Sequence, residues 1–152
     1  MTSELTFTRV TPADRETLEG LVRDYYAYDG HDYVEAEQGP ALDLVCQGAA
    51  NSLAWLIHGG GELAGYLILT TGFSVEYGGT DGFIDELHLV EAFRGRGLGA
   101  HVMDFAEKAG RQAGIRYLHL EVEIHNARAR RLYDGRGYVD SERTLMSKRL
   151  VE

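Results

Sequence analysis

Apolar residues along this chain form short runs or occupy every second position, which predicts a strand-rich fold. The stretches with this pattern are residues 5–10, 53–58, 63–71, 83–89, 117–124, 138–139 and 145–151. A glycine triplet at residues 59–61 separates the second stretch from the third and indicates a hairpin between them. Residues 72–82 contain a further glycine pair and are expected to form a connecting loop before the next strand.

Other segments carry apolar residues three and four positions apart, which predicts helices. Leu18, Leu21 and Val22 have this spacing, in a helix that Pro12 opens and Thr11 caps. The expected helices cover residues 12–28, 40–47, 98–113 and a segment that begins after Asn126. Residues 30–39 are polar and acidic, and we expect a loop or a broken helix there.

Strands and helices interleave along the chain, so the predicted class is α/β (α+β). We expect a central, mostly antiparallel twisted sheet of six to seven strands, flanked by about four helices. A chain of 152 residues is long enough for one sizeable core and predicts a single domain over residues 1–152. It has no apolar run of membrane-spanning length and no signal peptide, and its lone Cys46 fits a reducing cytoplasm.

Charge is distributed unevenly along the chain. Residues 1–90 hold 15 acidic and 3 basic side chains, a balance of −12, whereas residues 91–152 hold 9 acidic and 12 basic ones, a balance of +3. The two halves account for the net charge of −9. The acidic half favours a cationic partner and opposes nucleic acid, and the basic half suits an anionic cofactor.

The glycine-rich turn at residues 94–99, Arg-Gly-Arg-Gly-Leu-Gly, lies between a predicted strand and a predicted helix. Glycines at such a junction let the backbone approach a ligand closely, and the N–H groups at the helix start favour a phosphate. Two arginines in the same turn add cationic donors. The turn therefore predicts a pyrophosphate site and a nucleotide-like cofactor.

Two common phosphate motifs compete for this turn. The lysine phosphate loop needs Gly-Lys-Ser/Thr at its end, which is absent here. The dinucleotide fingerprint fits in its relaxed form through Gly95, Gly97 and Ala100, with Glu121 about 20 residues further on. Against it, the preceding strand carries Asp85 and too little chain follows for a doubly wound domain. A dinucleotide-binding oxidoreductase is kept as an alternative.

The chain resembles the GNAT superfamily of N-acetyltransferases in two motifs. The acetyl-coenzyme A loop of that family, Arg/Gln-x-x-Gly-x-Gly/Ala, is matched by Arg94, Gly97 and Gly99. The second motif, an Asn followed by a helix with Leu-Tyr and then Gly-aromatic, is matched within residues 126–138. Residues 9–14 are also similar to the opening of the family, so the resemblance covers nearly the whole chain and implies the GNAT fold.

The resemblance implies acetyl-CoA as co-substrate, with no metal. In the family the pantetheine arm lies against the fourth strand, and backbone N–H groups of the glycine turn hold the pyrophosphate. The cofactor-binding residues that follow from this are Leu87, His88, Leu89, Arg94, Gly95, Arg96, Gly97, Leu98, Gly99, Ala100, Asn126 and Ala129. None of the six histidines has metal-ligand spacing.

Tyr133 is the expected general acid, because it matches the tyrosine of the second motif. It follows Asn126 by seven residues, so the two lie on roughly one face of a helix. A phenol with a pKa near 10 stays protonated at neutral pH and can give its proton to the departing thiolate.

The diamine and polyamine branch of the family is the most similar branch. It carries an acidic pair where Asp85 and Glu86 stand here, in the reverse order, and an aromatic-acidic pair matched by Tyr28 and Asp29. We expect Tyr28, Asp29 and Asp85 to bind a small cationic amine or a lysine-like acceptor. Asp85 or Glu86 is the expected base, and alternation along a strand predicts that the two face opposite sides of the sheet.

The leading hypothesis is therefore an amine N-acetyltransferase of the cytoplasm. A coenzyme A-binding sensor or interaction module without catalysis would share the fold and is the first alternative. Dimers are common in the family, so a homodimer is compatible with the chain, whereas nucleic acid and membranes are not expected partners.

Overall fold

The structure is a computed structural model that describes residues 4–49 and 51–152. Its contacts divide the chain into two compact units, Met1–Glu121 and Val122–Glu152. Each unit is described by itself, and the expectation of a single domain over residues 1–152 stays a prediction.

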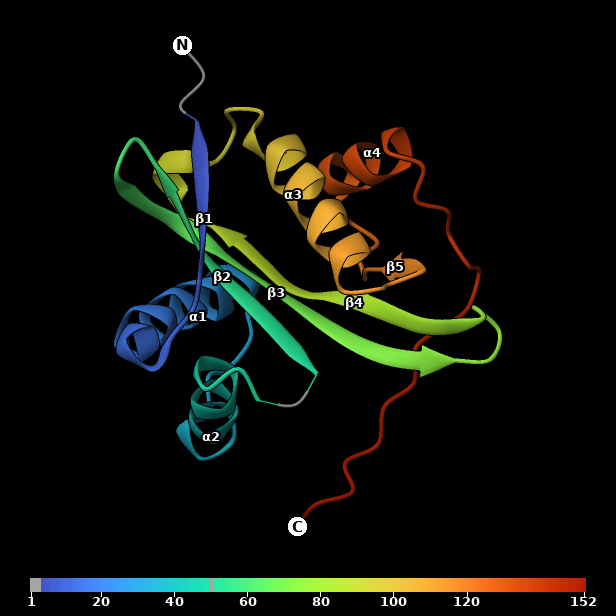
Figure 1. Cartoon of the computed structure of the whole chain (residues 1–152), viewed down its shortest axis with the longest axis horizontal. Coiled ribbons are helices and arrows are strands. Elements are labelled where there is room, and N and C mark those ends of the chain that lie inside the picture. The colour runs from blue at the N-terminus through green and yellow to red at the C-terminus, as the bar shows by residue number, and fades with distance from the viewer. Residues whose placement is uncertain (1–3, 50) are drawn as a thin grey trace. The chain divides into compact units, whose positions relative to one another are not determined.

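The first unit contains a mixed sheet of five strands in the order β1-β2-β3-β4-β5 (Figure 1). The strands are β1 (Leu5–Arg9), β2 (Ser52–Gly59), β3 (Glu62–Ser74), β4 (Gly79–Leu89) and β5 (Tyr117–His119). All neighbours pair antiparallel except β4 and β5, which are parallel. The mostly antiparallel sheet predicted from the alternating pattern is confirmed.

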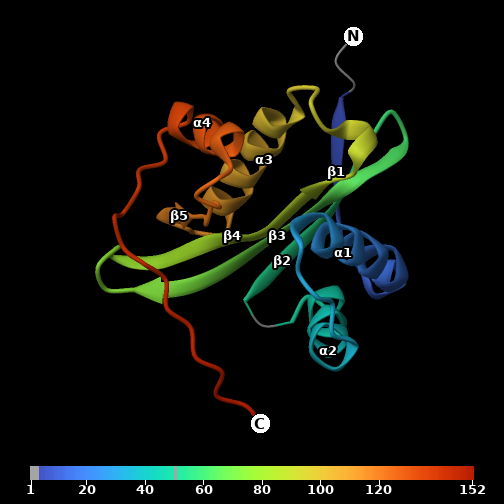
Figure 2. The ribbon, with the colours of Figure 1, turned by 180° about the vertical axis from the view of Figure 1, so that it is seen from behind.

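Helices cover both faces of this sheet. Figures 1 and 2 show α1 (Arg15–Asp29) and α2 (Glu35–Cys46) on one face and α3 (Leu98–Gln112) on the other. The fourth helix, α4 (Ala127–Gly135), belongs to the second unit, and short 3-10 turns precede α1 and α3. No helix in the described part of the chain has both the length and the apolar character needed to cross a bilayer.

Alternation along β3 builds the two cores of the first unit. Tyr66 and Ile68 point toward α1 and α2, whereas Leu67 and Leu69 point toward α3. All four side chains are buried, because helices cover the sheet on both faces. The face with α1 is the one on which most of the polar site residues gather.

The second helix is longer than predicted and includes part of residues 30–39, where we expected a loop or a broken helix. It begins at Glu35, and Pro40 lies inside it. The side chain of Gln38 accepts the backbone N–H of Val34 at 2.7 Å, and Glu35 and Glu37 stand in the first turn. This side-chain acceptor and the two acidic residues stabilise a helix start five residues earlier than the proline suggested.

The hairpin between β3 and β4 is also longer than predicted, because strands extend into the expected loop at residues 72–82. β3 runs to Ser74 and β4 starts at Gly79. The turn between them is closed by the N–H of Gly78, which donates to the carbonyl of Val75 at 3.1 Å. Gly78 has φ +80° there, so one tight turn replaces the longer loop.

The prediction of six to seven strands is wrong, since the described residues form five. The stretch 117–124 is a strand only over Tyr117–His119, and residues 138–139 and 145–151 form no strand. Asp140 and Ser141 instead accept the N–H groups of Glu142 and Arg143, so these local bonds compete with a strand ladder. Alternating apolar residues favour a strand only where a partner edge is available, which composition does not reveal.

Candidate active site

A bulge in β4 shapes the centre of the site. In the register with β3, Asp85 is an extra residue between the pairs made by Ile84 and Glu86. Ile84 and Leu87, three residues apart, both pack on the α3 side of the sheet. The expectation that Asp85 and Glu86 face opposite sides depended on unbroken alternation, and the bulge removes that basis.

Glu86 is held between two tyrosines on the α1 side. The hydroxyl of Tyr26, from α1, donates to Glu86 Oε2 at 2.8 Å, and the hydroxyl of Tyr66, from β3, donates to Oε1 at 2.7 Å. Tyr66 is fully buried. Burial raises the pKa of the Glu86 carboxyl, although the two phenols act in the opposite direction. A proton acceptor at this position would therefore be fixed in place and shielded from water.

Replacing Glu86 with Gln should change how stability depends on pH. Because burial raises the pKa of Glu86 in the folded state, the folded protein loses stability as pH rises from the ordinary glutamate range through that raised pKa. Glu86→Gln removes this loss. The free energy of unfolding of the variant, relative to that of the native protein, should therefore increase as the pH rises from 4 to 7. Urea unfolding followed by the fluorescence of Trp55 measures it, and a constant difference across that range would contradict the assignment.

Asp85 differs from Glu86 in its exposure. Its side chain is exposed, and it takes no hydrogen bond or ion pair within residues 4–49 and 51–152. Crowding by neighbouring atoms nevertheless raises the pKa of its carboxyl by desolvation, and its charge adds to the raised pKa of Glu86. Asp85 is thus the acidic group of the pair that a cationic ligand could reach.

His88 lies two residues further along β4, on the same side as Glu86. It is 4% exposed, and its Nε2 lies 2.7 Å from Asp24 Oδ2 on α1. Burial lowers the pKa of His88, against the opposing effect of Asp24. The neutral ring then donates its Nε2–H to Asp24.

The glycine turn has the geometry expected of a phosphate site. Gly95 and Gly97 adopt φ +70° and +72°, in the left-handed region, and Gly97 is the residue that caps α3. Leu98 is buried and anchors the first turn of the helix. The first N–H groups of α3 have no partner within the helix, so they are available to an anion.

The side chains of the two arginines of the turn differ in burial and in the groups that they contact. Arg94 is half-buried and contacts α1, with its guanidinium centre 3.8 Å from the ring centroid of Tyr28. Arg96 is exposed and donates to the carbonyl of Ala92 at 3.3 Å. That both arginines bind the phosphate stays a prediction.

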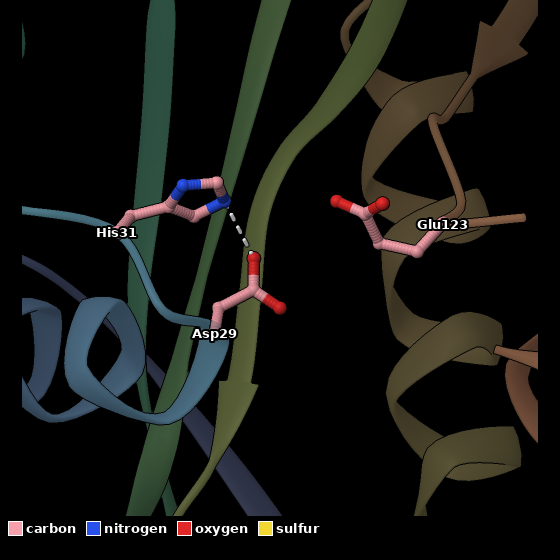
Figure 3. Close-up of side chains that lie close together, drawn as sticks. All are labelled: Asp29, His31 and Glu123. Carbon is pink, nitrogen blue, oxygen red and sulfur yellow. Dashed lines mark ion pairs between the residues drawn. The ribbon is translucent and has the colours of Figure 1, made fainter. Parts of the chain in front are cut away.

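Two of the three predicted acceptor residues, Tyr28 and Asp29, lie at the end of α1, and the third, Asp85, lies in β4. Tyr28 is 66% exposed, and one face of its ring carries Arg94. The carboxylate of Asp29 faces His31, whose Nε2 lies 2.9 Å from Asp29 Oδ2 (Figure 3). Glu123, also drawn there, belongs to the second unit. Within the chain itself, Asp29 thus contacts the basic side chain of His31, and Tyr28 contacts the cationic side chain of Arg94.

The second unit positions the predicted general acid. Asn126 caps α4, and its Oδ1 accepts the N–H of Ala129 at 3.1 Å, so its predicted capping role is confirmed. The ring of Tyr133 lies 6.0 Å from that of Tyr138. Burial raises the pKa of Tyr133, so its phenol stays protonated at neutral pH.

Sequence reasoning missed three residues of the site: Asp24, Tyr26 and Tyr66. Tyr66 stands in an apolar run of β3, and its only distinguishing mark is a polar atom on an otherwise apolar stretch. Tyr26 lies four residues after Val22, which puts it on the buried side of α1. That spacing could have indicated a tyrosine facing the sheet.

Part of the chain is similar in sequence to curated N-acetyltransferases. It is 37% identical over 70 residues to the uncharacterized N-acetyltransferase YycN of Bacillus subtilis (strain 168), which covers 46% of this chain and 44% of that protein. It is 32% identical over 81 residues to the aminoalkylphosphonate N-acetyltransferase of Salmonella typhimurium (strain LT2), 53% of each protein. The chain thus spans about half the length of the curated relatives that it matches.

Solved structures share the fold at lower identity. The aminoglycoside N-acetyltransferase AAC(6')-Iy in complex with CoA superposes with a TM-score of 0.77 at 13% identity, over 99% of this chain and 98% of that one. Residues 16–138 match the Acetyltransferase (GNAT) family. This match covers most of the 152 residues and agrees with the sheet, the glycine turn and α4 described above. The chain belongs to the acetyltransferase (GNAT) family.

Proposed function

We propose that the protein transfers the acetyl group of acetyl-CoA to a primary amine of a small cationic acceptor. The observation that carries this proposal is the turn after β4, where left-handed Gly95 and Gly97 lead directly into α3. A turn of this kind offers free N–H groups and the positive end of a helix dipole to a pyrophosphate. Membership in the GNAT family supports acetyl-CoA as the co-substrate.

The binding roles follow the path from β4 to α3. Backbone groups of Leu87, His88 and Leu89 are proposed to hold the pantetheine arm, and one N–H there would polarise the thioester carbonyl. The turn from Gly95 to Ala100 would bind the pyrophosphate. Asn126 and Ala129 are proposed as further pantetheine contacts, in addition to the cap that joins them.

The acceptor is proposed to bind through carboxylates and a tyrosine face. Asp85 is exposed and unpaired among the described residues, and Asp29 and Tyr28 are accessible at the end of α1. Carboxylates bind ammonium groups, and an aromatic face adds cation–π attraction. One curated relative is named for an aminoalkylphosphonate acceptor. A diamine, a polyamine or a lysine-like amine fits the acidic character of the first 90 residues.

The transfer itself needs a base and an acid. The ammonium of the acceptor must lose a proton before its nitrogen attacks, and Asp85 or Glu86, directly or through water, is the proposed proton acceptor. The nitrogen then forms a bond to the thioester carbon while the carbon–sulfur bond breaks. Tyr133 is proposed to donate its phenolic proton to the leaving thiolate, which gives the coenzyme A thiol. The proton that the acylated nitrogen then loses as the amide forms returns through water to the Tyr133 phenolate.

Neutralising Asp29 and Asp85 should weaken acceptor binding. The Asp29→Asn and Asp85→Asn variants each remove one charge that would pair with an ammonium, so the KM of the acceptor should rise about tenfold for each. Steady-state kinetics with a diamine as acceptor measure this. Asp32→Asn is the matched control, because Asp32 is exposed near the same helix end and its loss changes the net charge equally. Equal KM values in all three variants would refute the acceptor site.

A cytoplasmic location and a homodimer are part of the same proposal. The buried Cys46 thiol, whose pKa burial raises, is protected from oxidation and needs no disulfide partner. Size-exclusion chromatography with light scattering measures the oligomeric state directly.

A further inference from the structure

The Glu86 carboxylate is bonded to two phenols that come from different elements. Tyr26 of α1 donates to Oε2 at 2.8 Å, and Tyr66 of β3 donates to Oε1 at 2.7 Å. The titratable groups that act on Glu86 are these two phenols and Asp85, its neighbour on β4. An ionised carboxylate accepts at both oxygens and keeps a lone pair free on each. The two phenols therefore orient the group and leave it able to take a proton.

The two phenols are held in different ways. Tyr66 is fully buried in β3, which has a strand on either side, so the sheet fixes its position. Tyr26 is half-buried near the end of α1, four residues before Gly30, whose left-handed conformation (φ +74°) ends the helix. The position of the Tyr26 hydroxyl thus depends on how the end of α1 is held.

Residues 30–34, which join α1 to α2 and which we call the connector, pack against Tyr26. The N–H of His31 donates to the carbonyl of Tyr26 at 2.8 Å, and the two rings lie 6.4 Å apart. The ring of Tyr33 lies 6.1 Å from that of Tyr26. Both ring pairs meet edge to face, which is an arrangement that aromatic rings prefer. The connector therefore holds Tyr26 through its backbone and through its ring.

Tyr33 is itself anchored to α1. Its hydroxyl donates to Glu19 Oε1 at 3.1 Å, and the guanidinium centre of Arg23 lies 3.9 Å from the centroid of its ring. Arg23 Nη2 also lies 3.4 Å from Glu19 Oε1 and 3.2 Å from Oε2 of Glu35, the first residue of α2. An exposed ion pair contributes little by itself. These contacts converge on one ring, however, so together they hold Tyr33 against Tyr26.

The start of the connector adjoins the proposed acceptor site. His31 Nε2 lies 2.9 Å from Asp29 Oδ2, so an ammonium that pairs with Asp29 competes with His31 for that carboxylate (Figure 3). His31 also packs on Tyr26, whose hydroxyl is bonded to Glu86. A change at Asp29 can therefore reach Glu86 through two side chains of the first unit.

We propose that Tyr26 is a positioning residue: its hydroxyl orients Glu86 as the proton acceptor, and its ring makes that orientation depend on the connector. The inference rests on the proposed function for the reaction in which Glu86 takes part. One N–H bond of the acceptor ammonium breaks, the proton passes to Glu86 directly or through water, and the electron pair stays on the nitrogen for its attack. The neutral carboxyl then donates to the Tyr26 oxygen, because a hydroxyl accepts as well as donates. Glu86 keeps its orientation in both states and gives the proton to water after the product leaves.

The first test uses the protein without ligand. The pKa of the Glu86 carboxyl is measured by carbon-13 NMR in the native protein and in Tyr26→Phe, Tyr33→Leu and Tyr117→Phe. The Tyr26 phenol favours the ionised carboxyl, so its removal should raise the pKa of Glu86. Tyr33→Leu keeps both phenols and should raise this pKa less, with hydrogen exchange of residues 26–34 about threefold to tenfold faster. Tyr117→Phe removes the same atom from an exposed tyrosine of β5 and should leave the pKa of Glu86 at its native value.

Two results of this test would overturn the proposal. A native Glu86 pKa in Tyr26→Phe would show that the phenol does not orient the carboxylate. A native Glu86 pKa in Tyr33→Leu would show that the orientation does not depend on the connector.

The second test follows the pH dependence of kcat/KM for acetyl transfer to a diamine, whose acid limb reports the base of the free enzyme. In Tyr26→Phe this limb should move to higher pH, and kcat should fall about tenfold to 100-fold because the base is misplaced. The Kd of coenzyme A, measured by calorimetry, should stay within about twofold of native. A native acid limb in Tyr26→Phe, or a native kcat in Glu86→Gln, would overturn the proposal. If the native protein acetylates no amine, the proposed function fails, while the ligand-free test still decides whether Tyr26 orients Glu86.

Discussion

Replacing Tyr133 with Phe should lower turnover about 100-fold to 10,000-fold, the usual contribution of a general acid. The substitution removes one oxygen and keeps the ring, so the packing of α4 is preserved. Burial already raises the pKa of Tyr133, so the native phenol is protonated throughout the neutral range. Without it, the thiolate must take its proton from water. Coenzyme A affinity should change little, because the phenol acts on the leaving group.

Tyr138→Phe is the matched control for this prediction. Tyr138 lies on the same unit, its ring is 6.0 Å from that of Tyr133, and the substitution removes the same atom. Steady-state kinetics should give a kcat within about twofold of native for Tyr138→Phe, as for most changes away from the reacting atoms. Equal kcat values for Tyr133→Phe and the native protein would remove Tyr133 from the mechanism.

Replacing Gly65 with Ala should destabilise the protein by about 3 kcal/mol, at the upper end of overpacking effects. Gly65 lies on β3 opposite Leu89 of β4. A β-carbon there would overlap the carbonyl oxygen of His88 and lie 3.0 Å from Leu89 Cα. These are backbone atoms, so no rotamer change relieves the overlap and the two strands must separate. The displaced segment is the part of β4 proposed to hold the pantetheine arm, so coenzyme A binding should weaken as well.

Replacing a second glycine, Gly20, with Ala should instead stabilise the protein. Gly20 is an exposed residue within α1, and nothing lies within 4 Å of a β-carbon added there. Alanine should therefore stabilise the helix by about 0.5–1 kcal/mol. Thermal unfolding followed by the fluorescence of Trp55 should show a Tm about 6–12 °C lower for Gly65→Ala and a few degrees higher for Gly20→Ala. Similar Tm values for Gly65→Ala and the native protein would contradict the described β3–β4 register.

The fold was predictable where local pattern decides the structure. Leu18, Leu21 and Val22 have helical spacing and are buried against the sheet, and Gly97 marks the start of α3 as expected. The failures concern long-range pairing and side-chain bonds to the backbone. Nothing local to residues 145–151 shows whether a strand edge is available to them, and the N–H of Val34 finds an acceptor only once Gln38 turns back toward it.

The sequence motifs of the candidate site could be predicted, whereas the contacts between its side chains could not. The glycine turn and the cap at Asn126 were found from residue types at fixed spacing. The bulge at Asp85 was not, because an extra residue in a strand changes the register with β3 and leaves the composition of the strand unchanged. For the same reason the phenols around Glu86 were missed, since Tyr26 and Tyr66 come from elements 60 and 20 residues away.

The most direct test of the central claim is amine-dependent release of coenzyme A from acetyl-CoA. The acceptor panel should include diamines, polyamines, lysine analogues, aminoglycosides, aminoalkylphosphonates and short peptides, with a thiol-reagent blank because of Cys46. Acetyl transfer predicts release that depends on a cationic amine and falls at least about 100-fold in Tyr133→Phe. Measurable acetyl-CoA binding without release for any amine would contradict the proposed transferase and favour a coenzyme A-binding module.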